Sequence, residues 1–347
     1  MRTHPLDTPT PALRAIAVAL NEPTTARARA ALQQAAESAD IVELRLDLMD
    51  EFDLPRLLHD RPCPVVVTCR AAREGGHWQG SEEARLDVLR HAIDLGAEYV
   101  DVEADAIHSI AERGQSRTIA SSHDFARMPD DLLGLWQRLA ATGADVVKVV
   151  GMAADARDVV SVVQMFGAAD RPTIAIAMGP AGVASRVLAL RSPHCLLTFC
   201  ALESGGGTAP GQIGVAEMLS VYAARALSPS TAVVGLLGPT LDGEAVQRWN
   251  QAVRADGGNR VAVPYVVPDA DHVADAIASL RETDTRALAI SPAFQEVVGQ
   301  ALDTLEANAC RRGAVNFVEL AGGSLVGAWI DDEAEGAARL AGLAVPS

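Results

Sequence analysis

Lys148 lies in the middle of the run Val146-Val147-Lys148-Val149-Val150, which is typical of a buried strand in a parallel sheet. Burying a charged lysine is costly, and desolvation lowers the pKa of a lysine and makes its amine nucleophilic. A neutral amine in this position can form an imine with a ketone. The alternatives are a side chain that extends out of the strand to solvent, or one that pairs with Glu43 or Asp101 inside the protein.

His123 follows another predicted strand, in the sequence Ser121-Ser122-His123-Asp124. An imidazole has an ordinary pKa of about 6.5, which suits it to take up and return one proton at neutral pH. Glu74 follows a further predicted strand and would hold the imidazole in one tautomer, as an orienting carboxylate does beside other catalytic bases. The non-catalytic alternatives are a histidine that caps the next helix and a carboxylate exposed on a loop. Together with Lys148, the two residues predict proton transfer next to an imine.

Charged residues also follow or interrupt other apolar runs. Glu43 and Arg45 lie two apart on one predicted strand, so they point to the same side, and Arg70 ends the next strand. Arg186 begins the helix after a later strand, and a Gly-rich segment, residues 204–212, follows the last one. Glycines there allow close backbone approach to a ligand or the movement of a lid, although such loops are often only turns.

The elements that must position these residues alternate strand and helix. Short β-branched runs predict eight strands, with Ala- and Leu-rich segments of helical spacing between them. The predicted strands are residues 13–20, 41–48, 64–70, 98–103, 117–122, 145–151, 172–178 and 195–201. Eight such units close a (β/α)8 barrel, whose active site forms at the carboxyl ends of the strands.

A second α/β pattern begins after a short linker at residues 227–230. It predicts strands at 232–237, 260–266 and 287–291, helices at 243–255, 270–281 and 294–308, and a hairpin that turns at 321–323. We therefore expect an α/β protein with a TIM barrel domain over residues 1–227, whose last helix covers 215–226. A small three-layer α/β domain over residues 231–347 should follow it.

Charge and cysteine content exclude several functions. The 29 Lys and Arg residues against 45 Asp and Glu give a net charge of −16, which argues against nucleic acid or an anionic membrane as a partner. The five cysteines form no CxxC pair, so they suit free thiols in a reducing cytosol rather than disulfides or a zinc site. Without a signal peptide or a long apolar segment, the expected location is the cytoplasm.

The motifs together resemble type I 3-dehydroquinate dehydratase over residues 13–226. In chain order, the matching segments are ESADIVELRLD, TCRAAREGG, GAEYVDVE, SSHDF, GADVVKVV, AMGPAGVASR and LTFCALESGGGTAPGQ. Each motif alone is weak, but all seven in this order are specific. The resemblance implies a lyase that dehydrates 3-dehydroquinate to 3-dehydroshikimate, in the shikimate pathway of aromatic amino acid biosynthesis.

The resemblance also implies a role for each matching residue. Lys148 would be the Schiff-base lysine, His123 the general acid and base, and Glu74 the carboxylate that positions the imidazole. The residues at substrate-contacting positions are Glu43, Arg45, Arg70, Arg186, Thr208 and Gln212. Arg186, with Arg70 as a second candidate, would hold the substrate carboxylate. The reaction needs neither a metal nor a nicotinamide cofactor, and relatives suggest a homodimer.

The second pattern resembles the N-terminal, substrate-binding half of shikimate dehydrogenase, as in bifunctional dehydratase/dehydrogenase proteins. The resemblance is carried by VVGLLGPT and GAVNFVELAGGSLVGAWIDD, and Asn316 and Asp331 match positions of that family. However, residues 241–244 replace its Ser-rich loop, and residues 291–294 lack its catalytic lysine. Since the chain also ends at Ser347, before a nucleotide-binding domain, we expect no dehydrogenase activity.

Three alternatives remain beside the dehydratase. A class I aldolase also uses a lysine on a barrel strand and would cleave a carbon–carbon bond instead of removing water. The C-terminal domain would serve as a ligand-sensing or interaction module if it has lost its chemistry. A catalytically dead scaffold is disfavoured because every main barrel residue is present.

Overall fold

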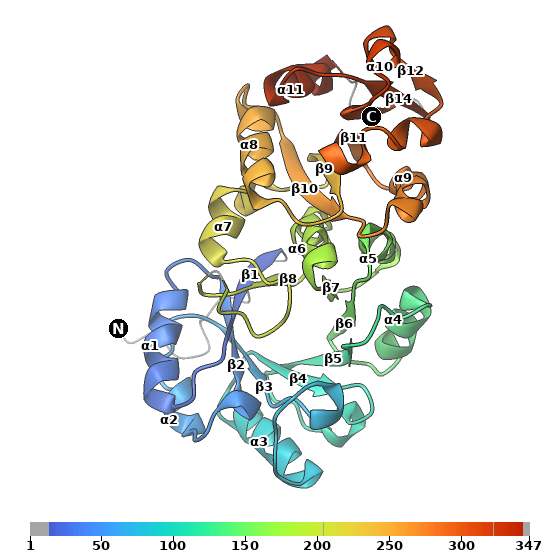
Figure 1. The fold of residues 1–347 in the computed structure, drawn as a ribbon. Helices are drawn as coiled ribbons and strands as arrows, with labels where there is room; N and C mark the ends of the chain where they lie inside the picture. Colours follow the sequence, from blue (N-terminus) through green and yellow to red (C-terminus); the bar gives the residue numbers. More distant parts are fainter. Residues whose placement is uncertain (1–13, 204, 322, 343–347) are drawn as a thin grey trace.

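The computed structural model describes residues 14–203, 205–321 and 323–342, which form two sheets that follow one another along the chain (Figure 1). The first is an eight-stranded parallel sheet, and the second is a six-stranded mixed sheet. The predicted first strand begins at Leu13, which lies outside the described residues.

The first sheet curls into a nearly closed barrel, as predicted. Its strands are β1 (Ala15–Leu20), β2 (Ile41–Arg45), β3 (Val65–Thr68), β4 (Tyr99–Glu103), β5 (Arg117–Asp124), β6 (Val146–Met152), β7 (Thr173–Met178) and β8 (Leu197–Cys200). Neighbouring strands pair in the order β7-β6-β5-β4-β3-β2-β1-β8. The remaining seam closes where Leu196 N donates to Thr173 O and Thr173 N donates to His194 O, at 2.9 and 2.8 Å.

Side chains alternate between the inside and the outside of the barrel, as the period of two requires. On β6, Val147 and Val149 pack outward against the helices, whereas Val146 and Val150 belong to the inner cluster. Lys148 is therefore on the inside of the barrel. Helices cover the apolar outer face, so the strands are buried on both faces.

Helices follow most of the barrel strands. They are α1 (Thr25–Ala35), α2 (Leu54–Leu58), α3 (Glu82–Asp94), α4 (Leu132–Ala140), α5 (Ala156–Ala168), α6 (Val183–Leu188) and α7 (Val215–Ser220). After β4 the structure has only a 3-10 turn, η4 (Ile107–Ser109). The predicted helix over 215–226 is too long, since α7 stops at Ser220 and Ala223 adopts left-handed φ of 50° before the short turn η7 (Ala224–Ala226).

The second sheet has the order β10-β9-β11-β13-β14-β12. Its strands are β9 (Ala232–Gly238), β10 (Arg260–Val266), β11 (Thr285–Ile290), β12 (Thr304–Leu305), β13 (Phe317–Ala321) and β14 (Ser324–Ala328). Its helices are α8 (Gly243–Arg254), α9 (Val273–Leu280), α10 (Ala307–Arg312) and α11 (Glu333–Gly342). The predicted hairpin is confirmed, because β13 and β14 pair antiparallel; Gly322 in its turn lies outside the described residues.

The predicted helix over residues 294–308 is wrong. That segment forms the 3-10 turns η9 (Pro292–Phe294) and η10 (Val298–Ala301), then strand β12, before α10 begins at Ala307. Asp303 explains the extended chain, because its N–H donates to Leu325 O at 3.0 Å and its carboxylate accepts from Leu325 N at 2.7 Å. Pairing with β14 thus overrides the local helical spacing. Helix α11 is present in the structure, although the sequence pattern did not indicate it.

The second sheet packs against the barrel beside its later helices (Figure 1). Strand β10 contacts α6 and the preceding turn η5 (Pro180–Gly182), and α9 contacts α5. One hydrophobic cluster includes residues of the barrel helices and of the second sheet, among them Val187 of α6 and Val263 of β10. Among the described helices, none is long and apolar enough to cross a membrane.

Candidate active site

Lys148 points into the barrel and is buried among charged groups from other strands. Its Nζ donates to Asp101 Oδ2 of β4 at 2.7 Å and lies 3.4 Å from Glu43 Oε1 of β2. The ring of Phe199 lies 4.6 Å from the same nitrogen. The alternative in which Lys148 reaches out to solvent is therefore wrong, whereas the other alternative, pairing with Glu43 or Asp101 inside the barrel, is what the structure shows, with both carboxylates. That pairing leaves the amine inside the cavity described below.

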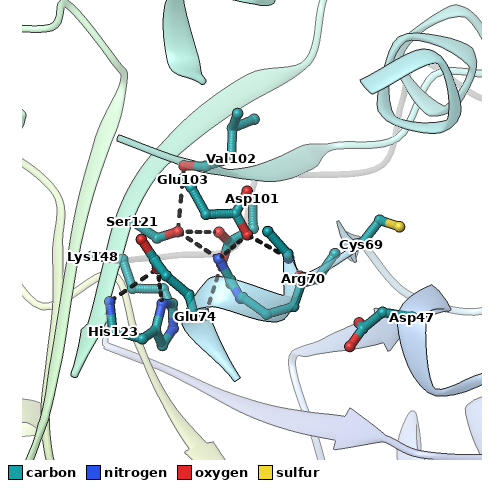
Figure 2. A network of polar contacts seen from close by, with 12 residues as sticks. Asp47, Cys69, Arg70, Glu74, Asp101, Val102, Glu103, Ser121, His123 and Lys148 are labelled. Atoms are coloured by element: carbon teal, nitrogen blue, oxygen red, sulfur yellow. Dashed lines mark hydrogen bonds and ion pairs between the residues drawn. The ribbon is translucent and has the colours of Figure 1, made fainter. Parts of the chain in front are cut away.

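A buried ion network holds Asp101 in place, as Figure 2 shows. Arg70 lies 2.8 Å from Asp101 Oδ2 and 2.9 Å from Glu103 Oε1, and it donates to Ser121 Oγ at 2.8 Å. Ser121 Oγ in turn donates to Asp101 Oδ1 at 2.6 Å. Burial alone would raise the pKa of Asp101, but the charges of Arg70 and Lys148 hold it well below its usual range. Asp101 thus faces the Lys148 nitrogen as a carboxylate.

Glu74 fixes His123 by two contacts. The backbone N–H of His123 donates to Glu74 Oε2 at 3.0 Å, and the ring Nδ1 lies 2.9 Å from the same oxygen (Figure 2). With Glu74 ionised, Nδ1 must carry the proton, which leaves Nε2 as an acceptor. Glu74 ends the turn η3 (Ala72–Glu74), and Gly75 follows with φ of 75°. A Cβ at Gly75 would lie 2.4 Å from the Phe125 ring, so this close turn requires glycine.

The pKa values of this pair are shifted in opposite directions. Burial raises the pKa of Glu74 to about 7, although Arg70 opposes the shift. Burial and the charges of Arg70 and Lys148 lower the pKa of His123 well below its ordinary value. The pair therefore takes up a proton as the pH falls through about 7. Above that pH, the imidazole is neutral and can act as a base.

We predict that kcat/KM falls as the pH drops below about 7, because protonated Glu74 no longer accepts the Nδ1 proton. The Glu74→Gln variant should lose activity on the order of 10²-fold, and its acid limb should move to lower pH, where only His123 titrates. Measuring kcat/KM of both proteins over a range of about four pH units centred on pH 7 checks this. An acid limb that stays in place in Glu74→Gln would contradict the assignment.

Arg186 differs from the other arginines of the site. It lies on α6, and its guanidinium donates to the carbonyl oxygens of Phe199 and Pro210, at 3.4 and 3.2 Å. Its Nε is buried with no hydrogen-bond partner among the described residues, and burial lowers its pKa to about 10. Arg45, by contrast, pairs with Asp47 at 2.8 Å. Within the described part of the chain, no carboxylate lies within ion-pair distance of Arg186.

All nine predicted site residues line one open cavity of ≈ 570 Å³ at the carboxyl ends of the barrel strands. They are Glu43, Arg45, Arg70, Glu74, His123, Lys148, Arg186, Thr208 and Gln212. The Gln212 side chain organises its own loop, since Oε1 accepts from Thr208 N at 2.7 Å. Ser204 of the same loop lies outside the described residues.

A family model described as type I 3-dehydroquinase matches residues 16–229, which is more than half of the sequence. The chain belongs to the type I 3-dehydroquinase family. The matched span contains every residue of the cavity described above.

Two relatives agree with the type I 3-dehydroquinase match, and one of them is similar to this chain beyond the matched residues. The chloroplastic bifunctional 3-dehydroquinate dehydratase/shikimate dehydrogenase of Arabidopsis thaliana is 34% identical over 293 residues, which cover 81% of this chain and 48% of that protein. The 3-dehydroquinate dehydratase of Pyrobaculum aerophilum is 39% identical over 212 residues, covering 58% of this chain and 68% of that one. This chain therefore spans about half the length of the Arabidopsis protein. Because 293 residues exceed the span 16–229, the likeness continues into the second sheet, which is shikimate dehydrogenase-like.

A solved structure supports the barrel. The type I 3-dehydroquinate dehydratase of Clostridium difficile, with covalently modified comenic acid, superposes with a TM-score of 0.53 at 25% identity. The match covers 61% of this chain and 91% of that one.

Other signals for the type I 3-dehydroquinase site are present in the sequence. Asp101 and Glu103 lie two apart in the apolar strand β4, the same spacing that singled out Glu43 and Arg45, and both are buried in the network. Lys148 is also the only lysine in the 347 residues, so 28 of the 29 basic residues are arginine. Arginine cannot form an imine, so Lys148 is the one side-chain amine in the sequence that could do so.

The second sheet has a cavity of its own, of ≈ 850 Å³, at the carboxyl ends of β9 and β11. Its lining includes Asp242, Arg248 and Ser291. Asn316 does not line it, because its side chain is bonded to the backbone of Ile330 at 2.7 and 2.8 Å. Asp331, the other matching residue, is likewise outside the lining.

Proposed function

We propose that the protein is a 3-dehydroquinate dehydratase of the shikimate pathway that acts through a Schiff base on Lys148. The observation that carries this proposal is the placement of Lys148 in one cavity with the His123–Glu74 pair and with Arg186, which has no carboxylate partner among the described residues. Membership of the type I 3-dehydroquinase family supports it. The product would be 3-dehydroshikimate, with one molecule of water released.

The proposed reaction uses the side chains in sequence. The Lys148 amine adds to the substrate ketone, and loss of water gives a protonated imine. His123 Nε2 removes a proton from the carbon next to the imine, whose nitrogen accepts the electron pair, and Asp101 and Glu43 face that nitrogen. The imidazolium then returns the proton to the departing hydroxyl group as the enamine electrons form the conjugated double bond. Hydrolysis of the imine releases the enone and restores Lys148.

We propose that Arg186, and not Arg70, holds the substrate carboxylate. Arg70 already has Asp101 and Glu103 as partners, whereas Arg186 has only carbonyl oxygens among the described residues. A buried guanidinium with open donors is suited to bind a carboxylate by charge-assisted hydrogen bonds. Glu43, Arg45, Thr208 and Gln212 would contact the rest of the substrate.

The Arg186→Met variant should raise KM for 3-dehydroquinate on the order of 10²-fold and lower kcat much less, because hydrogen bonds to the carboxylate are lost. Steady-state kinetics measure both values. Arg61→Met is a matched control, since Arg61 pairs with Glu98 near the amino ends of the strands. Equal KM values for Arg186→Met and the wild type would show that the carboxylate binds elsewhere.

The function itself is tested by incubating the protein with 3-dehydroquinate and following the ultraviolet absorbance of the enone. A parallel assay for aldehyde release distinguishes the class I aldolase alternative. Enone formation without aldehyde supports the dehydratase, and aldehyde without enone would replace it with the aldolase.

We propose that residues 1–227 and 231–347 are separate domains of a cytoplasmic homodimer without metal or nicotinamide. The free thiols of all five cysteines support a reducing compartment.

We also propose that the second domain has no dehydrogenase activity, because residues 291–294 lack a lysine and the only lysine of the chain is in the barrel. Its separate cavity favours ligand binding as a second role, which a thermal-shift titration with shikimate would detect.

A further inference from the structure

One helical segment joins the barrel cavity to the second sheet. Helix α6 (Val183–Leu188) continues directly into the turn η6 (Ala189–Arg191). Arg186 on α6 lines the cavity, and Arg191 at the end of η6 contacts the second domain. Every residue of α6 is buried. The two arginines thus lie on one short helical segment, Arg186 within α6 and Arg191 at the end of η6.

Arg191 is the main polar connection of this segment to the second domain. Its Nη2 donates to Asp284 Oδ2 at 2.9 Å, immediately before β11, and to Pro229 O at 3.1 Å in the linker. The Arg191 side chain is 10% exposed, whereas the Asp284 side chain is 67% exposed, so the ion pair is shielded from water only on the Arg191 side. The interface therefore holds the end of η6 by a charge-assisted contact rather than by apolar packing alone.

The second sheet also supports the loops on either side of Arg186. Strand β10 packs against α6 and against η5, the turn that leads into α6. Gly179, just before η5, donates its N–H to Pro210 O at 3.1 Å, and a Cβ at Gly211 would lie 2.3 Å from Gly179 O. The loop that carries Thr208 and Gln212 therefore rests on the same segment that the second sheet supports.

Few polar contacts fix Arg186, so it depends on the packing of α6, to which β7 and α5 of the barrel and β10 of the second sheet all contribute. Its guanidinium has no carboxylate partner among the described residues, and a helix of one and a half turns is not stable by itself. Its position must come from packing around α6. We infer that the second domain acts as a brace for the substrate-carboxylate site, with Arg191 as a positioning residue that acts through Arg186. This inference rests on the proposed function.

The test is a set of full-length variants assayed with 3-dehydroquinate. Arg191→Ala should raise KM about three- to tenfold with kcat within about twofold of the wild type. Asp284→Asn, a milder change at the exposed partner, should raise KM by a smaller factor. Arg157→Ala is the matched control, because Arg157 approaches Asp275 at 3.9 Å in the same interface but lies on α5. Its KM should be unchanged.

A double-mutant cycle distinguishes positioning from general loosening of the barrel. If Arg191 acts through Arg186, the double variant Arg186→Met/Arg191→Ala should have the KM of Arg186→Met alone. Additive effects on KM in the double variant, or an unchanged KM in both Arg191→Ala and Asp284→Asn, would overturn the inference that the second domain positions Arg186. These outcomes require a wild type that turns over 3-dehydroquinate, so failure of the wild type would count against the proposed function instead.

Discussion

Replacing Lys148 by arginine should lower kcat for 3-dehydroquinate on the order of 10⁴-fold or more, since no imine forms and no other lysine exists in the chain. Arginine is the informative substitution because it keeps a positive charge opposite Asp101 and Glu43. Lys148→Ala would instead remove a buried cation that Asp101 shares with Arg70 and that also lies beside Glu43, which is destabilising. Steady-state turnover and a thermal melt of each variant measure the two effects separately.

The outcome expected for Lys148→Arg is a folded, inactive protein. The melting temperature of Lys148→Ala should fall below that of Lys148→Arg, because Asp101 loses a partner at 2.7 Å. Turnover by Lys148→Arg above a small fraction of the wild-type rate would contradict covalent catalysis, whatever the stability of the variant.

The second large effect concerns His123. The His123→Ala variant should lose turnover on the order of 10² to 10⁴-fold, because the proposed carrier of the proton beside the imine is removed. The imine itself should still form, since Lys148 and its partners are intact. Mass spectrometry after borohydride reduction would therefore detect an adduct of the unreacted substrate in His123→Ala, while enone formation nearly stops.

His194 provides the control for this variant. It lies where β7 and β8 begin, at the opposite end of the barrel from the cavity, and its carbonyl oxygen accepts from Thr173 N. His194→Ala should keep near wild-type turnover. If His123→Ala lost both the adduct and the turnover while remaining folded, His123 would be needed for imine formation and its role as the later proton carrier would be wrong.

The barrel was predictable because its strands are apolar on both sides, so polar residues in them stand out. Lys148 stands out because valines flank it, and the period of two predicts that Glu43 and Arg45 point to the same side of their strand. The structure places all three residues in the cavity. The partners of Lys148 depend on which strands meet across the interior. Asp101 comes from β4 and Glu43 from β2, two and four strands away in the sheet, so the curvature of the sheet brings both to Lys148.

Arg70 and Arg186 show what spacing along the chain does not determine. Both were candidates for the substrate carboxylate, yet Arg70 is paired inside the barrel whereas Arg186 is not, and this difference arises from tertiary contacts. A tertiary contact also explains why the helix predicted at 294–308 does not form, because Asp303 binds the backbone of Leu325, which is distant in sequence. Local pattern predicts elements well only where no distant strand competes for the chain.

The most direct test of the Schiff base on Lys148 is the mass of the wild-type protein after reduction with borohydride during turnover of 3-dehydroquinate. Because the chain has one lysine, the N-terminal amine is the only other site of reductive amination, and a peptide digest separates the two. We predict one covalent adduct, on the peptide that contains Lys148. An unmodified mass, in a sample that is forming enone when borohydride is added, would contradict the imine mechanism.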